Sequence, residues 1–443
     1  MDCEALAWTI PRQRLRANVR NGWKADIDRS TLAQLCNPHY SVPMQSDISR
    51  EPVLGIFLRF LRFGFLAWGG PVAQIAMIKR ELVEEERWIE PSRFNRLLAI
   101  YQVLPGPEAH ELCVHFGMMR GKRLGGLLAG LGFMLPGLVL ILALAWAYQG
   151  LDLRQPLVAA IFTGVQIGVI ALIVRAAHRI ADHTLTGVWL WVIGLSSAGA
   201  AALGVSFWVT LPAAGLAYAA LAARSYGIAV LILASAVVLA IWIGSNTPLI
   251  GSQLPDGVVE TVEAGSVAAL ALFLSGLKAG LLTFGGAYTA IPFVRGDAVG
   301  RGWVSEGQFL DGLALSGVIP APLIIFATFV GYVAGGFGGA LAMTAGIFLP
   351  AFAFALLFYD RLERVIEDQR LHRFLEGVAA GVVGLIAVTA VQLGWNVARS
   401  APSLPLAAVV FGAGLALLYL WRSKLSVPAV VIGSGVAGIL AFA

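Results

Sequence analysis

Residues 57–71 read FLRFLRFGFLAWGGP, and residues 273–286 repeat the pattern as FLSGLKAGLLTFGG. In both copies an aromatic residue followed by two glycines interrupts an apolar segment. Further features recur at offsets that drift only from 216 to 213 residues: Leu104-Pro105-Gly106-Pro107 as Ile319-Pro320-Ala321-Pro322, Leu135-Pro136-Gly137 as Leu349-Pro350-Ala351, and Gly164-Val165 as Gly377-Val378. Apolar segments that are interrupted at matching places of two halves are typical of secondary transporters. The sequence therefore predicts a duplicated membrane transporter whose site lies where the interruptions meet.

The composition excludes a soluble globular protein, since 58% of the 443 residues are hydrophobic and only 13% are charged. The formal net charge is +5, but Lys and Arg lie in short clusters between apolar runs. This pattern favours a role in membrane orientation over a nucleic-acid partner. The three cysteines, Cys3, Cys36 and Cys113, form no CxxC pair, so we expect no disulfide, no thiolate metal site and no cofactor.

Residues 1–50 differ from the rest of the chain, because they are polar and basic and lack an apolar stretch long enough for a signal peptide. We expect them to form a disordered cytoplasmic tail. Met44 lies just before the first apolar segment, which makes it a candidate for the natural start of translation. A native protein whose intact mass requires residues upstream of Met44 would contradict this hypothesis.

Thirteen apolar runs, from 54–77 to 425–442, approach the length of about 20 residues that spans a bilayer. We therefore predict an all-α polytopic protein of the inner (plasma) membrane. Its first half is expected at 51–245, a linker at 246–264 and the second half at 265–443. Seven segments precede the linker, and an odd number predicts that the halves form an inverted repeat. Association as a homodimer is left open.

The basic clusters, among them Arg175 with Arg179, fall on the cytoplasmic side if the tail is inside, as the positive-inside rule requires. The loop at 79–93 is the exception. Four of its residues would place positive charge outside: Lys79, Arg80, Arg87 and Arg93. A first segment that re-enters at its Gly-Gly interruption in each half, at 54–77 and at 266–292, would remove this conflict.

Two cations stand at matching positions, because Arg62 and Lys278 each precede the aromatic-Gly-Gly element by six residues. A cation within an apolar segment is costly and usually faces a cavity or a partner. We expect both to be charge partners of a bound anion. The alternative is that their charged ends snorkel to the membrane interface. Arg59, Lys79 and Arg80 are predicted to supply supporting charge.

The four interruptions, at 69–71, 104–107, 285–286 and 319–322, are the predicted substrate-binding backbone. Glycine lets the backbone leave helical geometry and proline ends the preceding turn. Such backbone is tolerated at membrane depth only where it is buried in protein or lines a cavity, and a helix that restarts there offers N–H groups to an oxyanion. The alternative is simple helix kinking. The predicted cradle consists of Gly69, Gly70, Pro71, Pro105, Gly106, Pro107, Gly285, Gly286, Pro320 and Pro322.

Two acids, Glu108 and Glu111, follow the first proline-rich interruption directly. They are not duplicated, since the second half has Leu323 and Phe326 at the corresponding positions. Unmatched acids inside a membrane segment suit proton coupling, so we predict that both are coupling residues. Pairing with Arg62 or Lys79 is equally open.

His110 and His115 accompany the two acids. Their spacing is one residue too long for the HExxH zinc motif, so the histidines fall on different helix faces and no metal site is expected. The alternative from another functional class is a membrane-embedded enzyme that uses Glu108, Glu111 and His115. We predict a transporter and not an enzyme.

These residues resemble the CHR family of chromate transporters, in the long form with two homologous halves. The resemblance covers the chain from about residue 52 to the C-terminus. It rests on Phe63-Gly64 through Pro71, the run from Ile75 to Glu81 with Trp88, Leu104 to Pro107, Gly125-Gly126 with Phe133 to Pro136, Phe284-Gly285-Gly286 and Leu349-Pro350.

The resemblance implies export of chromate, a divalent tetrahedral oxyanion shaped like sulfate, and hence chromate resistance. Transport would be driven by the membrane potential or by exchange. Trp68 stands where the family commonly has phenylalanine, and the stretch from Glu108 to Glu111 replaces a smaller, hydroxyl-bearing one. These departures leave a sulfate-type or other anion as the alternative substrate.

Overall fold

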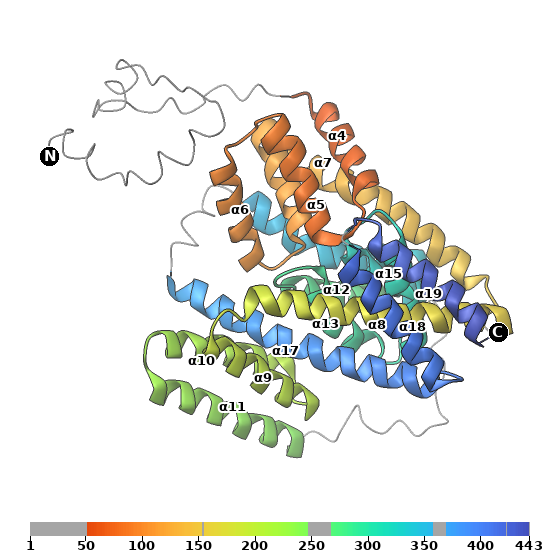
Figure 1. Ribbon diagram of the computed structural model, residues 1–443. Coiled ribbons are helices and arrows are strands. Elements are labelled where there is room, and N and C mark those ends of the chain that lie inside the picture. Colours follow the sequence, from red (N-terminus) through yellow and green to blue (C-terminus); the bar gives the residue numbers. More distant parts are fainter. Residues whose placement is uncertain (1–50, 153–154, 247–266, 358–368, 422, 443) are drawn as a thin grey trace, which may run out of the picture. The chain divides into compact units, whose positions relative to one another are not determined.

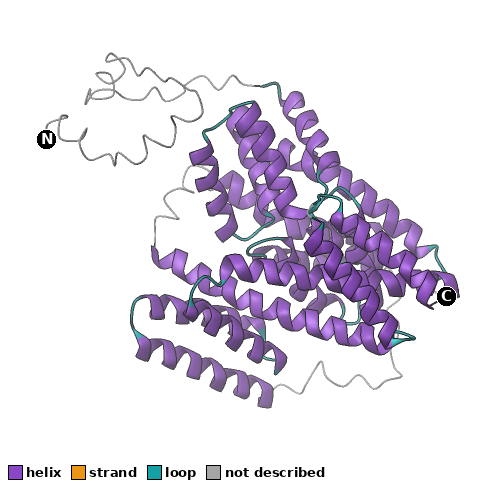
Figure 2. Cartoon of the chain, in the orientation of Figure 1, coloured by secondary structure: helices purple, strands orange, loops and turns teal. Residues whose placement is uncertain are grey.

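A computed structural model describes residues 51–152, 155–246, 267–357, 369–421 and 423–442 (Figures 1 and 2). Every regular element within these ranges is a helix. The prediction of an all-α protein is confirmed. The predicted tail with Met44, and all of the predicted linker except its first residue, lie outside the described residues.

Four of the described helices are long and apolar enough to cross a membrane. They are α7 (Glu108–Gln149), α8 (Pro156–Thr184), α15 (Phe326–Leu357) with the preceding turn η4 (Leu323–Ile325), and α17 (Gln369–Ser400). Shorter apolar helices accompany them: α9 (Val188–Ala202), α10 (Phe207–Ala222), α11 (Tyr226–Asn246), α12 (Ala269–Leu281), α18 (Leu404–Leu420) and α19 (Ser426–Phe442). The fold is that of a multi-pass membrane protein, while the total of thirteen segments stays a prediction.

The remaining helices are short because glycine and proline interrupt the segments that contain them. The predicted segments 54–77 and 266–292 are each divided at the Gly-Gly element. Beside the Gly-Gly elements lie α4 (Val53–Leu66), α5 (Gly70–Ile78) with its π-helical continuation η2 (Lys79–Glu85), η3 (Ala287–Ala290) and α13 (Ile291–Ala298), together with α12. The helices that end at the proline-rich interruptions are α6 (Pro91–Val103) and α14 (Glu306–Val318).

The duplication extends to the backbone of the long helices. α7 leaves helical geometry at Gly121 (φ −132°, ψ 19°) and Lys122 (φ 53°, ψ −154°). α15 does so at Gly335 (φ −138°, ψ 20°) and Gly336 (φ 61°, ψ −157°). Since these positive φ angles favour glycine, Lys122 holds a conformation that costs about 1–3 kcal/mol. The same kink is therefore present in both halves, although the first half has Lys122 where the second half has Gly336.

α7 and α15 each carry a short helix of their own half at very close range. A Cβ atom on Gly64 of α4 would lie 2.6 Å from the carbonyl oxygen of Phe133 in α7. A Cβ atom on Gly280 of α12 would lie 2.4 Å from the carbonyl oxygen of Ile347 in α15. Only glycine permits such an approach of two helix backbones. Because Gly64 corresponds to Gly280 and Phe133 to Ile347, the same contact occurs twice.

Each half packs a pair of its helices on a long helix of the other half. α18 and α19 pack on α8, whereas α9 and α10 pack on α17, beside which Figure 1 shows them. Glycines again set the spacing: a Cβ atom on Gly164 of α8 would lie 2.1 Å from the Ser434 carbonyl oxygen, and one on Gly377 of α17 would lie 2.6 Å from that of Ala214. Since α7 also packs on α15, each half depends on the other for its packing.

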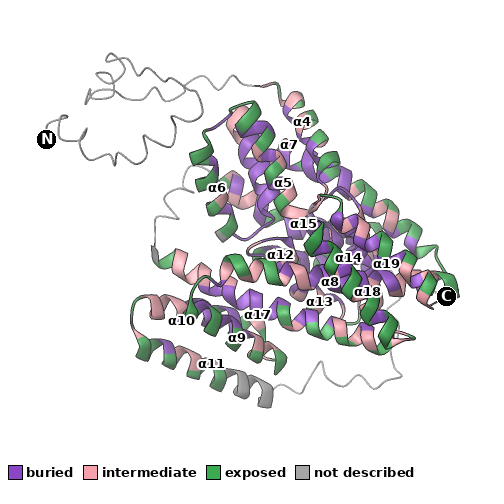
Figure 3. Ribbon diagram, viewed as in Figure 1, coloured by how far each residue is buried: buried purple, intermediate pink, exposed green. Residues whose placement is uncertain are grey.

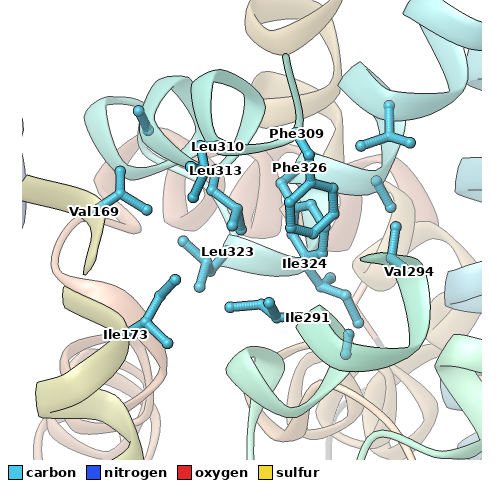
Figure 4. Packing of buried hydrophobic residues seen from close by; sticks show 14 of the residues in the cluster. Val169, Ile173, Ile291, Val294, Phe309, Leu310, Leu313, Leu323, Ile324 and Phe326 are labelled. Atoms are coloured by element: carbon cyan, nitrogen blue, oxygen red, sulfur yellow. The ribbon is translucent and has the colours of Figure 1, made fainter. Parts of the chain in front are cut away.

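The largest core cluster is built from both halves, and Figure 4 shows part of it. The residues labelled there come from α8, α13, α14, η4 and the start of α15: Val169, Ile173, Ile291, Val294, Phe309, Leu310, Leu313, Leu323, Ile324 and Phe326. Large apolar side chains also lie on the outside (Figure 3), among them Leu203, which is 86% exposed, and Trp146 and Val391, which are both 72% exposed. Such a surface is suited to contact with lipid.

Candidate functional site

The four interruptions meet, and one contact joins the first proline-rich interruption to the second Gly-Gly element. The backbone N–H of Gly106 donates a hydrogen bond to the carbonyl oxygen of Thr283, at 2.9 Å. Thr283 lies two residues before Gly285. The bond pairs backbone groups that are outside any helix, as buried irregular backbone requires.

The reciprocal contact runs through Gln74. Its Nε2 donates to the carbonyl oxygens of Ala67 and Ala321, both at 3.0 Å, and the residue is 1% exposed. In the repeat, Ala67 corresponds to Thr283 and Ala321 to Gly106. Gly106 and Thr283 are joined by a direct hydrogen bond. Their counterparts, Ala321 and Ala67, are joined instead through the side chain of Gln74.

Close packing repeats the same relation. A Cβ atom on Gly137 of α7 would lie 2.3 Å from the Cβ of Ala321, and one on Gly106 would lie 3.2 Å from the Cβ of Ala351 in α15. Gly137 corresponds to Ala351 and Gly106 to Ala321. The contact thus occurs twice, with the halves exchanged. Equivalent contacts therefore join each half to the other near the interruptions.

The interruptions leave helix starts that no side chain caps. Gly69 (φ +90°), Gly70 (φ +79°), Gly285 (φ +73°) and Gly286 (φ +117°) adopt left-handed backbone, which favours glycine. Within the described residues, the helical segments that follow have no side-chain hydrogen bond at their N-caps; they begin at Gly70, Glu108, Ala287 and Leu323. A Cβ atom on Gly70 or Gly286 would meet nothing within 4 Å. Helix starts without a side-chain cap keep the partial positive charge of their first N–H groups, which is the property that an anion site requires.

Arg62 and Lys278 are each paired with a carboxylate of their own half. Arg62 Nη1 lies 3.5 Å from Glu81 Oε2, and Lys278 Nζ forms an ion pair with Asp297. Glu81 corresponds to Asp297 in the repeat, so the acids are duplicated like the cations. The Arg62 side chain is 65% exposed and that of Lys278 is 15% exposed. No hydrogen bond joins either side chain to a described residue of the interruptions, and their role as charge partners of an anion stays a prediction.

The three supporting cations lie in ion pairs at the surface around η2. Exposed pairs of this kind contribute about 0–1 kcal/mol each. They include two of the four basic residues of the loop at 79–93, Lys79 and Arg80. They are Arg59 with Glu51 (3.4 Å) and Glu86, Lys79 with Glu84 (4.0 Å), and Arg80 with Glu81 (3.6 Å) and Glu85 (3.5 Å).

Glu108 and Glu111 are buried at the start of α7, beside the point where the interruptions meet. Glu108 is 6% exposed and Glu111 is 0% exposed. A Cβ atom on Gly106 would lie 2.7 Å from Glu111 Oε1. Neither carboxylate oxygen of Glu111 has a hydrogen-bond partner in the described part of the chain. Both acids are without the ion pair to Arg62 or Lys79 that was the open alternative, since these cations pair with other glutamates.

The two histidines of this stretch point to different neighbours. The His110 ring packs on Phe348 and Phe352 of α15, with centroid distances of 5.0 Å and 4.6 Å. His115 Nδ1 lies 2.8 Å from the hydroxyl of Tyr101. A search of the described residues finds no group of three His, Cys, Asp or Glu placed to hold a metal ion.

A sequence model of the chromate transporter family matches residues 54–251 and 270–439, which is most of the chain. The chain belongs to the chromate transporter family. The resemblance found in the sequence is confirmed, and the family is one of transporters rather than enzymes.

Two relatives of this chromate transporter family member cover most of its length, and a third covers a shorter part. The chromate transport protein of Pseudomonas aeruginosa is 60% identical over 391 residues, which are 87% of this chain and 92% of that protein. The probable chromate transport protein of Synechococcus elongatus is 29% identical over 392 residues, 86% of this chain and 93% of that one. The uncharacterized transporter YwrB of Bacillus subtilis is 27% identical over 148 residues, which are 33% of this chain but 74% of that protein. No solved structure matches.

Two further cations of this chromate transporter family member belong to the surroundings of the site. Arg179 of α8 interacts electrostatically with Glu108, and Arg175 and Arg179 both do so with Tyr288 of η3. Nη1 of Arg175 is buried and finds no acceptor among the described residues. Its Cζ lies 5.2 Å from the centroid of the Tyr419 ring. Positive charge is thus available beside the second Gly-Gly element.

Sequence reasoning missed Gln74, Arg175 and Arg179 as site residues. It assigned the arginines to a cytoplasmic cluster and did not single out Gln74, the one polar side chain in α5. The comparison of the halves contains the missing signal, because none of the three is repeated. The corresponding residues are Ala290, Val388 and Gln392.

An apolar cavity of about 460 Å³ lies between α8, α17 and α18. Its lining includes Ile170, Val391 and Phe411 and contains no charged side chain. A divalent oxyanion would lose its hydration there without gaining a partner. The meeting point of the interruptions is therefore the candidate site of this chromate transporter family member.

Proposed function

We propose that the chain is a secondary transporter that exports chromate across the inner membrane through the meeting point of the interruptions. The observation that carries the proposal is the reciprocal contact between halves, with Gly106 on Thr283 and Gln74 on Ala321. Interrupted helices that meet between two repeated halves are the usual position of a transporter's substrate site. Relatives named as chromate transport proteins support chromate as the anion.

The anion is bound chiefly by backbone. Four oxygens that share two negative charges accept several hydrogen bonds at once, and uncapped helix starts offer N–H donors together with a partial positive charge. The glycines and prolines predicted as a cradle supply these starts. Gly70 and Gly286 support this role, since both have left-handed backbone and open space beside them.

Arg62 and Lys278 serve as charge partners in this proposal. Each already neutralises an acid, Glu81 or Asp297, so the anion competes with that carboxylate for the cation. The exposed Arg62 meets the anion at the surface, while the more buried Lys278 meets it within the protein. The duplicated ion pairs support an equivalent role for the two cations in the two halves.

Glu108 and Glu111 serve as coupling acids. A dianion and two ionised carboxylates in one apolar region repel one another strongly. The buried and unpaired Glu111 is therefore neutral when the anion is bound. Binding of a proton and binding of the anion then favour each other to the same extent, as linkage requires.

The membrane potential is sufficient to drive export. Each negative charge that leaves the cell gains about 2.3 kcal/mol per 100 mV of inside-negative potential. If chromate leaves without a proton, its two charges gain about 4.6 kcal/mol. At about 1.4 kcal/mol per tenfold ratio, this sustains an outward gradient of about 2,000-fold. A carrier for chromate can therefore confer resistance without hydrolysing a nucleotide.

The two halves, 51–245 and 265–443, form an inverted repeat in this proposal. The matched kinks of α7 and α15 and the exchanged helix pairs support an equivalent role for the halves. The family match in two stretches is consistent with it, and so is a relative that matches 33% of this chain over 74% of its own length. The basic clusters between apolar runs support the inner membrane.

Chromate uptake into inverted vesicles tests the proposal. Vesicles from cells that express the chain should accumulate chromate, faster with a potential that is positive inside the vesicle, and sulfate is added as a competitor. Chromate uptake no higher than in vesicles without the protein would contradict the proposal. Sulfate uptake that exceeds chromate uptake would instead favour the sulfate-type carrier.

A further inference from the structure

A second buried acid lies apart from the coupling acids named above. Asp311 of α14 is 3% exposed. Its Oδ2 accepts a hydrogen bond from the Tyr148 hydroxyl of α7 at 2.7 Å, and its Oδ1 accepts one from Gln166 Nε2 of α8 at 2.8 Å. Both donors are neutral, and the described residues give Asp311 no ion pair.

The elements packed around Asp311 bring no charge to it. α14 packs on α7, α8, α15, α19 and η4. α19 and η4 contain no titratable residue, and α15 contains only Tyr332. The charged side chains of α8 begin at Arg175, nine residues beyond Gln166. Those of α7, and its two histidines, all lie between Glu108 and Arg123, at least 25 residues before Tyr148, and Asp152 lies in the exposed loop after α7. On α14 itself, Glu306 is paired with Arg295.

The surroundings of the acid are apolar. The Tyr148 ring packs on Phe162 and Phe329, with centroid distances of 5.5 Å and 5.0 Å. A buried carboxylate that has only neutral partners is costly when ionised, and a proton removes that cost. An asparagine would accept either hydrogen bond without this cost. The acid is therefore suited to a change of protonation state, which an amide cannot undergo.

The cluster lies where the halves would move against each other. Asp311 belongs to the second half, and Tyr148 and Gln166 belong to the first. α14 leads to the proline-rich interruption at 319–322. The cluster is not repeated, since the corresponding residues are Arg96, Leu362 and Ala379. A shift of α14 against α7 and α8 would remove the donors from the carboxylate and so change its affinity for a proton.

We propose that Asp311 is a proton-binding site of the transport cycle, taking up a proton in one arrangement of the halves and releasing it in the other. This inference rests on the proposed function and adds to Glu108 and Glu111 a further acid that binds the coupling proton. The proton adds to a carboxylate oxygen and leaves from the same atom, so no further reactant is needed.

Proteoliposomes that contain a pH-sensitive dye test the inference, with equal pH on both sides and the potential clamped. A chromate gradient should move protons across wild-type membranes, and either direction supports the inference. Asp311→Asn should lose this proton movement and the pH dependence of net flux. It should keep exchange of labelled for unlabelled chromate, which requires no net proton transfer. The matched control is Asp182→Asn on α8, whose carboxylate is 62% exposed and pairs with His178, and it should behave as the wild type.

The contrary outcomes are distinct. Chromate flux without proton movement in the wild type overturns this inference and leaves the proposed function standing. Loss of exchange together with net flux in a folded Asp311→Asn protein assigns a structural role and also overturns it. If Asp311→Asn does not assemble, Asp311→Glu moves the carboxyl by one methylene, and an unchanged pH profile then contradicts the proposal. No chromate flux in the wild type overturns the proposed function itself.

Discussion

The close contact of α7 with the interruption at 319–322 gives a sharp test of the geometry of the site. A Cβ atom on Gly137 would lie 2.3 Å from the Cβ of Ala321 and 3.3 Å from its Cα. Carbon atoms in contact are separated by about 3.5–4.0 Å, so Gly137→Ala forces the two segments apart by more than about 1 Å. Overpacking of a well-packed site costs about 1–3 kcal/mol. Because the strain falls on the meeting point, we expect transport to suffer more than assembly.

The repeat contains the compensating change. In the corresponding contact the glycine and the alanine have changed places. Ala351 occupies the position of Gly137, and Gly106 occupies the position of Ala321. The double variant Gly137→Ala with Ala321→Gly transposes the pair into that arrangement. We expect it to recover most of the loss, with a coupling energy of about 1–3 kcal/mol. Ala321→Gly alone removes one methyl group and should cost about 1 kcal/mol or less.

Initial rates of chromate uptake into inverted vesicles, with thermal unfolding of the purified protein, measure these effects. Gly137→Ala should lower the rate about tenfold or more, since about 1.4 kcal/mol corresponds to a factor of ten. The control is Gly412→Ala in α18, where a Cβ atom meets nothing within 4 Å, and its rate should match the wild type. Wild-type flux in Gly137→Ala, or a double variant no better than the single one, refutes the reasoning.

Three further outcomes are expected. Arg62→Ala and Lys278→Ala should each abolish chromate flux at unchanged membrane content by immunoblot, and wild-type flux in both would remove these cations from the site. Gln74→Leu leaves two carbonyls without their donor, at about 1–3 kcal/mol each, so the thermal midpoint should fall; an equal midpoint contradicts the bridge. Gly164→Ala should lower the yield of monodisperse protein in size-exclusion chromatography, unlike Gly187→Ala, where a Cβ atom meets nothing within 4 Å, and equal yields would contradict the tight contact of α8 with α19.

The positions of the interruptions were predictable because glycine and proline act on the backbone where they stand. α4 ends three residues before Gly69 and α14 ends two residues before Pro320. Because the offsets match, each interruption found in one half supported the assignment of an interruption at the corresponding position of the other half. No information on packing was needed for this step.

The partners of the cations were not predicted, although they were within reach of the same comparison. Glu81 and Asp297 stand at one offset, as Arg62 and Lys278 do, so a duplicated cation with a duplicated acid already indicates an ion pair. What the sequence lacks is the turn of chain between them. The π-helical continuation of α5 carries Glu81 back to α4, and its geometry depends on packing.

The exchange of helix pairs has no local sequence pattern at all. α9 and α18 are uniformly apolar, and a helix that is apolar on every side gives no indication of the face that is buried. Gly164 and Gly377 mark close contacts without naming the partner. That α8 packs on α19, and α17 on α10, follows only from the way in which the complete halves fit together.

The unrepeated residues have a distinct physical role if the proposed inverted repeat holds. Two identical halves that exchange conformations would give inward-facing and outward-facing states of equal free energy, so neither state would be preferred at rest. Any preference, and any link to a second ion, must arise where the halves differ. Gln74, Glu111 and Asp311 are such differences, and all three lie at contacts between the halves or beside them. Variants at these positions should therefore change the balance of the two states, whereas changes at the matched glycines should impair both states alike.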